Sequence, residues 1–550
     1  MIEAYESSAV RAAEEPLLAA GVPLMDRAAF ALAAAAVREL RARTGRPGLN
    51  RNRAVLLVGP GNNGGDTLYA GARVAARGVH VVAVLVGDRV HDAALAALRA
   101  AGGTVVACTG EDTTTGALAG DIVTVAEAAD LMASADIVLD GLLGIGGRGG
   151  LRGSARDLVA ATVAVLGTRP LRSRPVVVAV DVPSGIGVDD GAIYGAADGP
   201  VLTADLTVTF GAVKSGLLLP PASAHVGRIE VVDIGLGLPG QAGPATTSAA
   251  AVRRLTAADL VSRGVLAVPA ADAHKYTRGV LGVVAGTQQF PGAAVLTVSG
   301  AIRAGVGMVR YLGAREVTAA VLAARPEAVP AGGRVQAWAL GPGISPAPPA
   351  TDEAARAQQG RIRHALAQVT GLLGSDVVGD VVPAAVDAGA IALLPRDCPP
   401  WLVITPHAGE LAELLRSRGE SVERSDVEAH PLAWARRARD LTGATVLLKG
   451  ATTVVVGPGV TYTQADGPSW LATAGAGDVL TGLLGSLLAA HSVAAVKDPA
   501  LPALLAASAS LLHGLAAHRA NPGGPVAALD VARALPATIA DVLAGRDPLA

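Results

Sequence analysis

Residues 55–66 read VLLVGPGNNGGD and indicate how the first half of this chain folds. Four apolar residues, 55–58, are followed by a turn that contains four glycines and two asparagines. A short apolar run that ends in such a turn is typical of a buried strand leading into a helix. The backbone amides of a glycine-rich turn at a helix start also attract phosphate, because no side chain blocks their approach.

The same alternation of apolar strand and helix extends along the whole chain. Runs that are apolar on both faces are typical of parallel sheets covered by helices on both sides, which predicts an α/β fold. We expect strands at 54–58, 79–86, 137–139, 176–180, 206–210, 280–285, 337–340, 402–404 and 445–448. Helices are expected between them, for example at 28–43, 92–101 and 293–305.

Length and composition restrict the class of protein. The 550 residues exceed the size of one compact domain, so two or three domains are expected. A net charge of −2 and an aromatic content of 2% argue against nucleic acid or an anionic membrane as a partner. Cys108 and Cys398 are too few and too far apart for a disulfide framework, so a cytoplasmic location is expected.

Neither a membrane span nor a secretory signal is expected. The longest apolar candidate, 479–496, contains Thr481, Ser486 and His491, and we interpret it as one buried helix of a large core. Residues 1–15 carry four glutamates and lack the apolar core of a secretory signal.

The clearest linker is 235–251, GLGLPGQAGPATTSAAA, which is rich in small residues and carries no charge. We therefore place an N-terminal domain at 1–240, a linker at 241–251 and a C-terminal domain at 252–550.

Two more polar turns follow predicted strands in the first half. Residues 140–150 read DGLLGIGGRGG, and residues 180–186 read VDVPSGI. The carboxyl ends of parallel strands meet at one edge of a sheet, where open α/β folds bind ligands. We expect the three turns to line one crevice.

These turns resemble those of the NAD(P)H-hydrate epimerase domain, as do GVPLMDRAA at 21–29 and TFGAVKSG at 209–216. The resemblance covers about residues 1–240 and implies a Rossmann-like three-layer αβα sandwich. It implies a potassium ion held by Asn63, Asp140 and Ser184, whose oxygen atoms suit that cation. Asp181 would be the proton shuttle and would also contact the substrate. The other implied substrate contacts are Asn62, Asn63, Gly64, Gly65, Asp66, Gly144, Ile145, Gly146, Gly147, Arg148, Gly149 and Gly150.

The implied reaction interconverts the R and S forms of a hydrated nicotinamide ring. The substrate carbon carries a hydroxyl beside the ring nitrogen, so expelling the hydroxyl or opening the ring erases the stereocentre. One carboxylate that gives and recovers a proton can serve both directions. Ile145 departs from the small polar residue that is more usual there. Lys214 either contacts the ligand or merely completes a strand.

A second candidate site surrounds residues 471–480, LATAGAGDVL. A glycine-rich turn leads into a helix there, so free amides and the positive end of the helix dipole favour phosphate. Asp478 would repel phosphate, and its usual purpose in such a place is to take a proton from a hydroxyl that is being phosphorylated. The alternative is that Asp478 only caps the helix.

Five motifs of the second half resemble, in the same order, the ADP/ATP-dependent NAD(P)H-hydrate dehydratase of the ribokinase-like superfamily. They are HKYTRG (274–279), FPGAAVL (290–296), ITPHAGE (404–410), LLKGATT (447–453) and WLATAGAGDVLTG (470–482). The resemblance covers about residues 251–540 and implies a ribokinase-like αβα domain.

This second resemblance also implies site residues. Ala294, Gly343, His407 and Asp478 would contact the hydrated nucleotide, with Asp478 as the base. The phosphoryl donor, ADP with ATP as the alternative, would contact Lys449, Gly450, Ala451, Thr452, Thr453 and Gly477. Phosphoryl transfer implies Mg²⁺. Gly389 stands where the family usually has a second Asp.

Together the resemblances predict a bifunctional nicotinamide nucleotide repair enzyme. It would epimerise the hydrates NADHX and NADPHX and dehydrate the S form at the expense of ADP, as a homo-oligomer. Two alternatives remain open, namely a ribokinase-like small-molecule kinase and a non-catalytic N-terminal binding or scaffold module. The choices between ADP and ATP and between the two hydrates also remain open.

Overall fold

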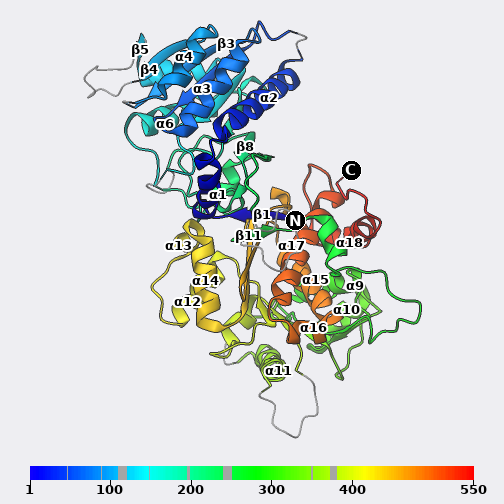
Figure 1. Ribbon diagram of the computed structural model, residues 1–550. Helices are drawn as coiled ribbons and strands as arrows, with labels where there is room; N and C mark the ends of the chain where they lie inside the picture. Colours follow the sequence, from blue (N-terminus) through cyan, green and yellow to red (C-terminus); the bar gives the residue numbers. More distant parts are fainter. Residues whose placement is uncertain are drawn as a thin grey trace. The chain divides into compact units, whose positions relative to one another are not determined.

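We describe residues 1–45, 48–87, 89–108, 121–147, 149–194, 199–238, 250–347, 351–371 and 381–549 of a computed structural model (Figure 1). The chain forms two compact units. The N-terminal unit is Glu3–Ala251, and the C-terminal unit is Val252–Ala550 together with Met1–Ile2. Most of the predicted linker, residues 241–249, lies outside the described residues.

The N-terminal unit is built on one parallel sheet with the strand order β10-β8-β7-β6-β2-β3-β4-β5. Its central strands are buried on both faces, as expected for parallel strands between two helical layers. The strands are β2 (Arg53–Val58), β3 (His80–Val86), β4 (Thr104–Cys108), β5 (Asp121–Val123), β6 (Ile137–Gly141), β7 (Val176–Val180), β8 (Leu206–Phe210) and β10 (Arg228–Val232). A short parallel pair, β1 (Ile2–Tyr5) with β9 (Val213–Lys214), completes the unit.

Helices cover both faces of this sheet (Figure 1). One core cluster joins the strands to α2 (Leu24–Thr44), α3 (Asn62–Ala75) and α4 (Asp92–Ala100), and a second joins them to α5 (Val125–Ala133) and α6 (Gly153–Gly167). Neighbouring residues of β2 belong to different clusters because side chains alternate between the faces of a strand. The expected three-layer αβα sandwich is confirmed. Helix α1 (Ser7–Ala19) precedes it, and α7 (Ser215–Leu218) follows β9.

The C-terminal unit has the strand order β13-β12-β14-β15-β16-β17-β18-β19-β11. The strands are β11 (Val252–Arg254), β12 (Val280–Val284), β13 (Met308–Tyr311), β14 (Ala337–Leu340), β15 (Ala384–Val386), β16 (Leu402–Ile404), β17 (Thr445–Leu448), β18 (Thr453–Gly457) and β19 (Val460–Gln464). Strands β12 to β17 are parallel, as predicted. Strands β18 and β19 instead form an antiparallel hairpin, because the two residues Pro458 and Gly459 close a tight turn between them.

Helices also lie on both sides of the C-terminal sheet. Figure 1 shows α12 and α14 on one side of the strands and α15 and α17 on the other. The helices are α8 (Ala257–Ser262), α9 (Pro291–Arg303), α10 (Arg315–Ala324), α11 (Glu353–Val369), α12 (Ala408–Ser417), α13 (Arg424–Ala429), α14 (Pro431–Thr442), α15 (Ala476–Ala490), α16 (Ser492–Lys497), α17 (Leu501–Ala520) and α18 (Ala528–Leu543). The expected αβα architecture is therefore present here too.

The prediction of one helix over 479–496 was wrong, because the chain forms α15 and α16 with a break at His491. The His491 backbone leaves the helical conformation, and its ring bonds the Val265 carbonyl at 3.0 Å. By length and composition, α17 is the described helix apolar enough to cross a membrane, and α1 with α2 would pass only as one span bent by 115°. Of the apolar stretch of α17, 78% is buried, as in a core helix.

Helices α9 and α15 pack at close range, because each offers a glycine to the backbone of the other. A Cβ at Gly300 would overlap the Val479 carbonyl, and a Cβ at Gly482 would overlap the Thr297 carbonyl. Helix α9 carries Ala294 and α15 carries Asp478, so this contact holds two parts of the predicted site in place.

We predict that Gly482→Ala destabilises the C-terminal unit by about 1–3 kcal/mol, the usual range for overpacking a core. Denaturant unfolding of the full chain, followed through the C-terminal transition, measures this change. Gly360→Ala is the matched control, since Gly360 lies in α11 with open space around its Cα and should gain helix propensity instead. Equal stability of the two variants would contradict the prediction.

Candidate active sites

In the N-terminal unit, the strands β7, β6 and β2 lie side by side, so the three predicted turns meet at one edge of the sheet as expected. Their approach is close. A Cβ at Gly59 would overlap the Leu142 carbonyl, and a Cβ at Gly64 would overlap the Gly59 carbonyl. Packing alone therefore requires glycine at these two positions.

A buried polar cluster contains the three residues predicted to hold potassium. Ser184 donates its backbone N–H and its hydroxyl to the carboxylate of Asp140 at 2.9 and 2.6 Å. The side-chain amide of Asn63 donates from Nδ2 to the Val180 carbonyl at 3.0 Å. The Oδ1 atom of Asn63 takes no part in this hydrogen bond. Burial raises the pKa of Asp140, and the hydrogen bonds from Ser184 oppose the rise. The donor atoms left for a cation are oxygens, which fits a hard ion.

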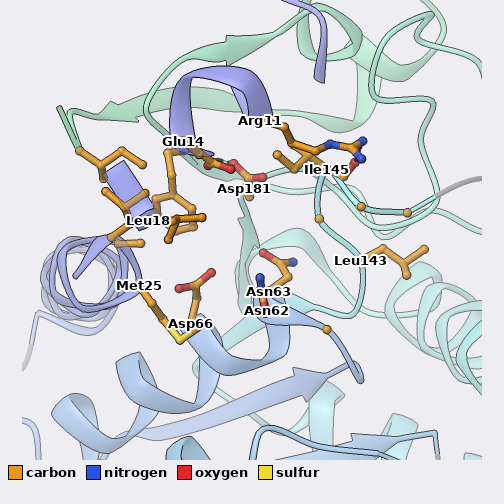
Figure 2. A pocket seen from close by; sticks show the side chains of 18 of the residues that line it. Arg11, Glu14, Leu18, Met25, Asn62, Asn63, Asp66, Leu143, Ile145 and Asp181 are labelled. Atoms are coloured by element: carbon orange, nitrogen blue, oxygen red, sulfur yellow. Dashed lines mark hydrogen bonds between the residues drawn. The ribbon is translucent and has the colours of Figure 1, made fainter. Parts of the chain in front are cut away.

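A cavity of about 470 Å³ opens at this sheet edge, and Figure 2 shows the side chains that line it. Its lining includes eight predicted contacts: Asn62, Asn63, Asp66, Gly144, Ile145, Gly146, Gly147 and Asp181. Gly149 and Gly150 line two adjoining hollows, and Gly64 and Gly65 are buried in the first turn of α3. Arg148 lies outside the described residues.

Asp181 is held by a buried ion pair with Lys214, which is 1% exposed. Lys214 also donates to the Thr209 hydroxyl at 3.1 Å and to the Phe210 carbonyl at 2.8 Å. Asp181 Oδ1 further accepts hydrogen bonds from Thr209 Oγ1 and the Phe210 N–H, each at 3.2 Å. The Asp181 backbone is left-handed, with φ of 67°, which costs energy in a residue other than glycine. Lys214 therefore does more than complete a strand: it fixes Asp181.

Two charged residues of the cavity were missed by sequence reasoning, and both come from α1. Arg11 donates to the Ile145 carbonyl at 2.8 Å, and Glu14 lines the cavity near Asp181 (Figure 2). Burial raises the pKa of Glu14, and the positive charge of Lys214 partly offsets this rise. No motif marks α1, because it precedes the sheet in sequence and reaches the site only through folding.

In the C-terminal unit, helix α15 begins at the predicted glycine-rich turn. Gly475 precedes the helix with φ of +85°, a conformation that glycine adopts without strain. Asp478 lies in the first turn of α15, at the positive end of the helix dipole. Burial raises the pKa of Asp478 to about 6, and the negative charge of Asp387 adds to the rise while Lys449 opposes it.

Asp387 is a residue of this second site that sequence reasoning did not assign. Its Oδ1 accepts from Lys449 Nζ at 2.8 Å, and its Oδ2 accepts from Thr481 Oγ1 at 2.9 Å. Lys449 Nζ also lies 3.8 Å from Glu410 Oε2, within ion-pair distance. Although burial lowers the pKa of Lys449, the charges of Asp387 and Glu410 raise it on balance. The signal in the sequence was the acidic residue that directly follows the strand at 384–386.

A cavity of about 590 Å³ adjoins this cluster. Its lining includes six predicted contacts: His407, Lys449, Gly450, Ala451, Thr453 and Gly477. Thr452 is buried beside them. The lining also holds Gln464, Asp466 and His513, each with a buried atom that lacks a hydrogen-bond partner in the described structure. Burial lowers the pKa of His513 to about 4, so its ring is neutral near pH 7.

Ala294 and Gly343 are brought together by the loops after β12 and β14, outside that cavity lining. The Gly286 N–H donates to the Pro342 carbonyl at 2.7 Å, and Thr287 Oγ1 donates to the Gly343 carbonyl at 3.1 Å. A Cβ at Gly389 would overlap the Ile344 carbonyl, so no larger residue fits there without movement of that loop. Gly389, which stands where the family usually has Asp, is thus in close contact with the backbone of a neighbouring loop.

Two further motifs, the one that contains His407 and HKYTRG, lie at different places in the C-terminal unit. His407 caps α12, accepting from the Glu410 N–H at 3.2 Å, and still lines the cavity. The motif HKYTRG directly precedes β12, so it lies at the amino end of a strand and not at the carboxyl edge where the other motifs gather.

Comparisons with known proteins agree with both halves of this description. Residues 22–216 match the family model described as YjeF-related protein N-terminus, and residues 281–536 match the model NAD(P)H-hydrate dehydratase. The chain is 41% identical, over 88% of its length and 89% of the relative's, to the bifunctional NAD(P)H-hydrate repair enzyme Nnr of Mycobacterium tuberculosis. It is 44% identical to the NAD(P)H-hydrate epimerase of Microbacterium testaceum over 46% of this chain and 88% of that one.

A solved structure of the ADP/ATP-dependent NAD(P)H-hydrate dehydratase from Bacillus subtilis, co-crystallised with ATP/Mg²⁺, is 25% identical, with a TM-score of 0.40 over 50% of this chain and 94% of that one. The fold and the family matches define a two-domain α/β enzyme with a candidate site in each domain. The chain belongs to the family of bifunctional NAD(P)H-hydrate repair enzymes.

We predict that Lys214→Met destabilises the N-terminal unit by about 3–5 kcal/mol, because it leaves the charge of Asp181 buried and unpaired. The double variant with Asp181→Asn should recover part of that loss. Denaturant unfolding of the full chain, followed through the N-terminal transition, measures both. The control Lys497→Met removes an exposed lysine and should change stability by less than about 0.5 kcal/mol. An equally small effect of Lys214→Met would refute the pairing.

Proposed function

We propose that the N-terminal unit interconverts the R and S forms of NAD(P)H hydrate and that the C-terminal unit dehydrates the S form at the expense of ADP. The observation that carries the proposal is that one chain holds both polar sites at sheet edges, each with the residues that the family motifs supply. The first unit would feed the second with the epimer it accepts.

In the first unit, Asp181 is placed to exchange a proton with the substrate. Three donors hold its Oδ1, and no donor among the described residues contacts Oδ2, so the latter is the oxygen left for the cavity. The glycine-rich turn at 144–147 lines the cavity, and its backbone amides before Gly147, whose own N–H bonds the Gly144 carbonyl, would face the substrate phosphates. Arg148 and the other loop residues named above complete this proposed binding surface.

In the second unit, Asp478 is the proposed base. It would take the proton from the hydroxyl of the S hydrate while that oxygen receives a phosphoryl group from ADP. The amides at the start of α15 would stabilise the charge on the transferring group. Phosphate, now a good leaving group, would depart with the C–O bonding pair, the neighbouring ring carbon would lose a proton to water, and the C=C bond of the dihydronicotinamide ring would form. Lys449 to Thr453 and Gly477 would hold the nucleotide, with ATP as the alternative donor.

The two cations remain proposals. Potassium would be held by Asn63, Asp140 and Ser184 beside the substrate, and it would supply charge neutralisation for bound phosphate. Magnesium would neutralise charge on the nucleotide. Among the described residues no group of three His, Cys, Asp or Glu side chains could hold a metal ion, so magnesium would rely mainly on phosphate and water ligands.

The kinase alternative explains Asp478 and its glycine-rich turn but gives no purpose to the complete site of the first unit. A scaffold role for the first unit does not require the buried pair of Asp181 and Lys214. Family membership favours neither alternative. A cytoplasmic homo-oligomer remains our expectation for the assembled protein; the free state of Cys108 and Cys398 agrees with a reducing compartment.

Wild-type protein with ADP, Mg²⁺ and potassium should restore the reduced-nicotinamide absorbance of a mixed R and S hydrate completely. Asp181→Asn should recover the S fraction quickly and the R fraction only at the spontaneous rate, because the second unit still works. Asp478→Asn should lose at least about 100-fold of the ADP-dependent rate. A phosphorylated product that accumulates without losing phosphate would favour the kinase instead.

We predict that dehydration of the S hydrate at saturating ADP has an acid limb with a midpoint near pH 6. A base must be ionised, and the pKa of Asp478 is raised to about 6, so the rate falls as pH drops through that value. Asp387→Asn should move the midpoint downward, because it removes a neighbouring negative charge. The exposed Asp440→Asn is the control. A midpoint that stays in place or rises in Asp387→Asn would count against Asp478 as the base.

A further inference from the structure

The epimerase cavity holds a second carboxyl that the single-carboxylate scheme leaves without a chemical task. Asp66 lies near the start of α3, whereas Asp181 follows β7. Figure 2 shows the Asp66 and Asp181 side chains directed into the same cavity from different walls, with Asn62 and Asn63 to one side. A ring bound between the two walls would present one face to each carboxyl.

The two carboxyls have opposite surroundings. Asp181 Oδ1 accepts from Lys214, Thr209 and Phe210, all of which stabilise a carboxylate. Asp66 has no such support: its Oδ1 is buried and lacks any hydrogen-bond partner among the described residues. Burial raises the pKa of Asp66 well above its usual value, and the charges of Asp181 and Glu14 add to the rise while Lys214 opposes it. Environments that separate two carboxyls in this way divide acid from base.

Glu14 is a weaker candidate for the acid. It comes from α1 and lies beside Asp181 in Figure 2, on the same side of the cavity. Two groups on one side can reach only one face of a bound ring. Asp66 is the carboxyl on the other wall.

We propose that Asp66 is a second catalytic residue of the epimerase site, the acid that protonates the leaving hydroxyl on one ring face while Asp181 accepts a proton from water on the other. This proposal rests on the epimerase function proposed above and assigns the chemistry within it.

The step balances as follows. The lone pair of the ring nitrogen forms a C=N bond as the bond between carbon and the hydroxyl oxygen breaks. The bonding pair of the broken C–O bond stays on the oxygen. This oxygen takes the proton of Asp66 and leaves as water. A water molecule then adds to the opposite face of the same carbon, the C=N pair returns to nitrogen, and Asp181 receives the proton. The substrate changes only its configuration, and the two carboxyls have exchanged protonation states, which solvent resets.

The test is the pH profile of epimerisation by the full chain, measured without ADP on one purified epimer by chromatographic separation of the two. The wild type should show an alkaline limb, because the rate falls at high pH as Asp66, whose pKa is raised, ionises. Arg11 and Glu14 from α1, Lys214 from β9 and His91 beside α3 also face this region and are unchanged in the Asp66 variants. A wild type without epimerase activity would refute the proposed function itself.

Asp66→Asn should lose about 100-fold or more in kcat, with a few-fold change in KM, and should lose the alkaline limb. Asp66→Glu should restore part of the rate together with an alkaline limb. Asp157→Asn, on the exposed face of α6, is the matched control and should behave as the wild type. The N-terminal unfolding transition of the same samples reports whether the unit that carries Asp66 is folded.

Three outcomes would overturn the assignment: Asp66→Asn keeps kcat within a few-fold of the wild type, it loses rate but keeps the alkaline limb, or Glu14→Gln alone removes the alkaline limb. The second outcome would mean that Asp66 only shapes the cavity. The third would place the acid on α1.

Discussion

A charged side chain that is buried beside the ends of parallel strands must have a partner of opposite charge, and both units of this protein are organised around that constraint. Lys214 pairs with Asp181 in the first unit, and Lys449 pairs with Asp387 in the second. The chain has only four lysines, and two of them form these pairs. Each pair gives one buried carboxylate a cationic partner where the sheet meets its cavity.

Each unit also holds a second carboxyl, Asp66 or Asp478, that forms no ion pair with the lysine. The pKa of Asp66 and that of Asp478 are both raised, chiefly by burial and then by a neighbouring carboxylate. In each unit a carboxylate paired with a lysine therefore lies near a carboxyl whose pKa is raised, and such contrasting environments are typical of proton-transfer sites. Two unrelated sheets thus reach comparable electrostatics from different strands.

Most of the fold follows from patterns that are local in sequence. The predicted strands at 176–180, 206–210, 337–340, 402–404 and 445–448 match the observed ones residue for residue, because an apolar run between turns specifies a buried parallel strand. The helix break at His491 was not predictable in this way. It depends on a bond to the Val265 carbonyl, 226 residues away, which no local pattern contains.

The candidate sites also combine residues that local sequence patterns predict with residues that only the tertiary structure reveals. The glycine-rich turns, Asp181 and Asp478 follow strands or open helices in an order that is written in the sequence, so the family and its motif residues follow from the sequence by itself. Only the tertiary structure shows that Lys214 closes on Asp181, that Asp387 links Lys449 to Thr481, and that α1 brings Glu14 to the cavity. The reason is physical: a motif records which residues are neighbours along the chain, whereas pairing, burial and the resulting proton affinities depend on residues that meet only after the sheet has formed.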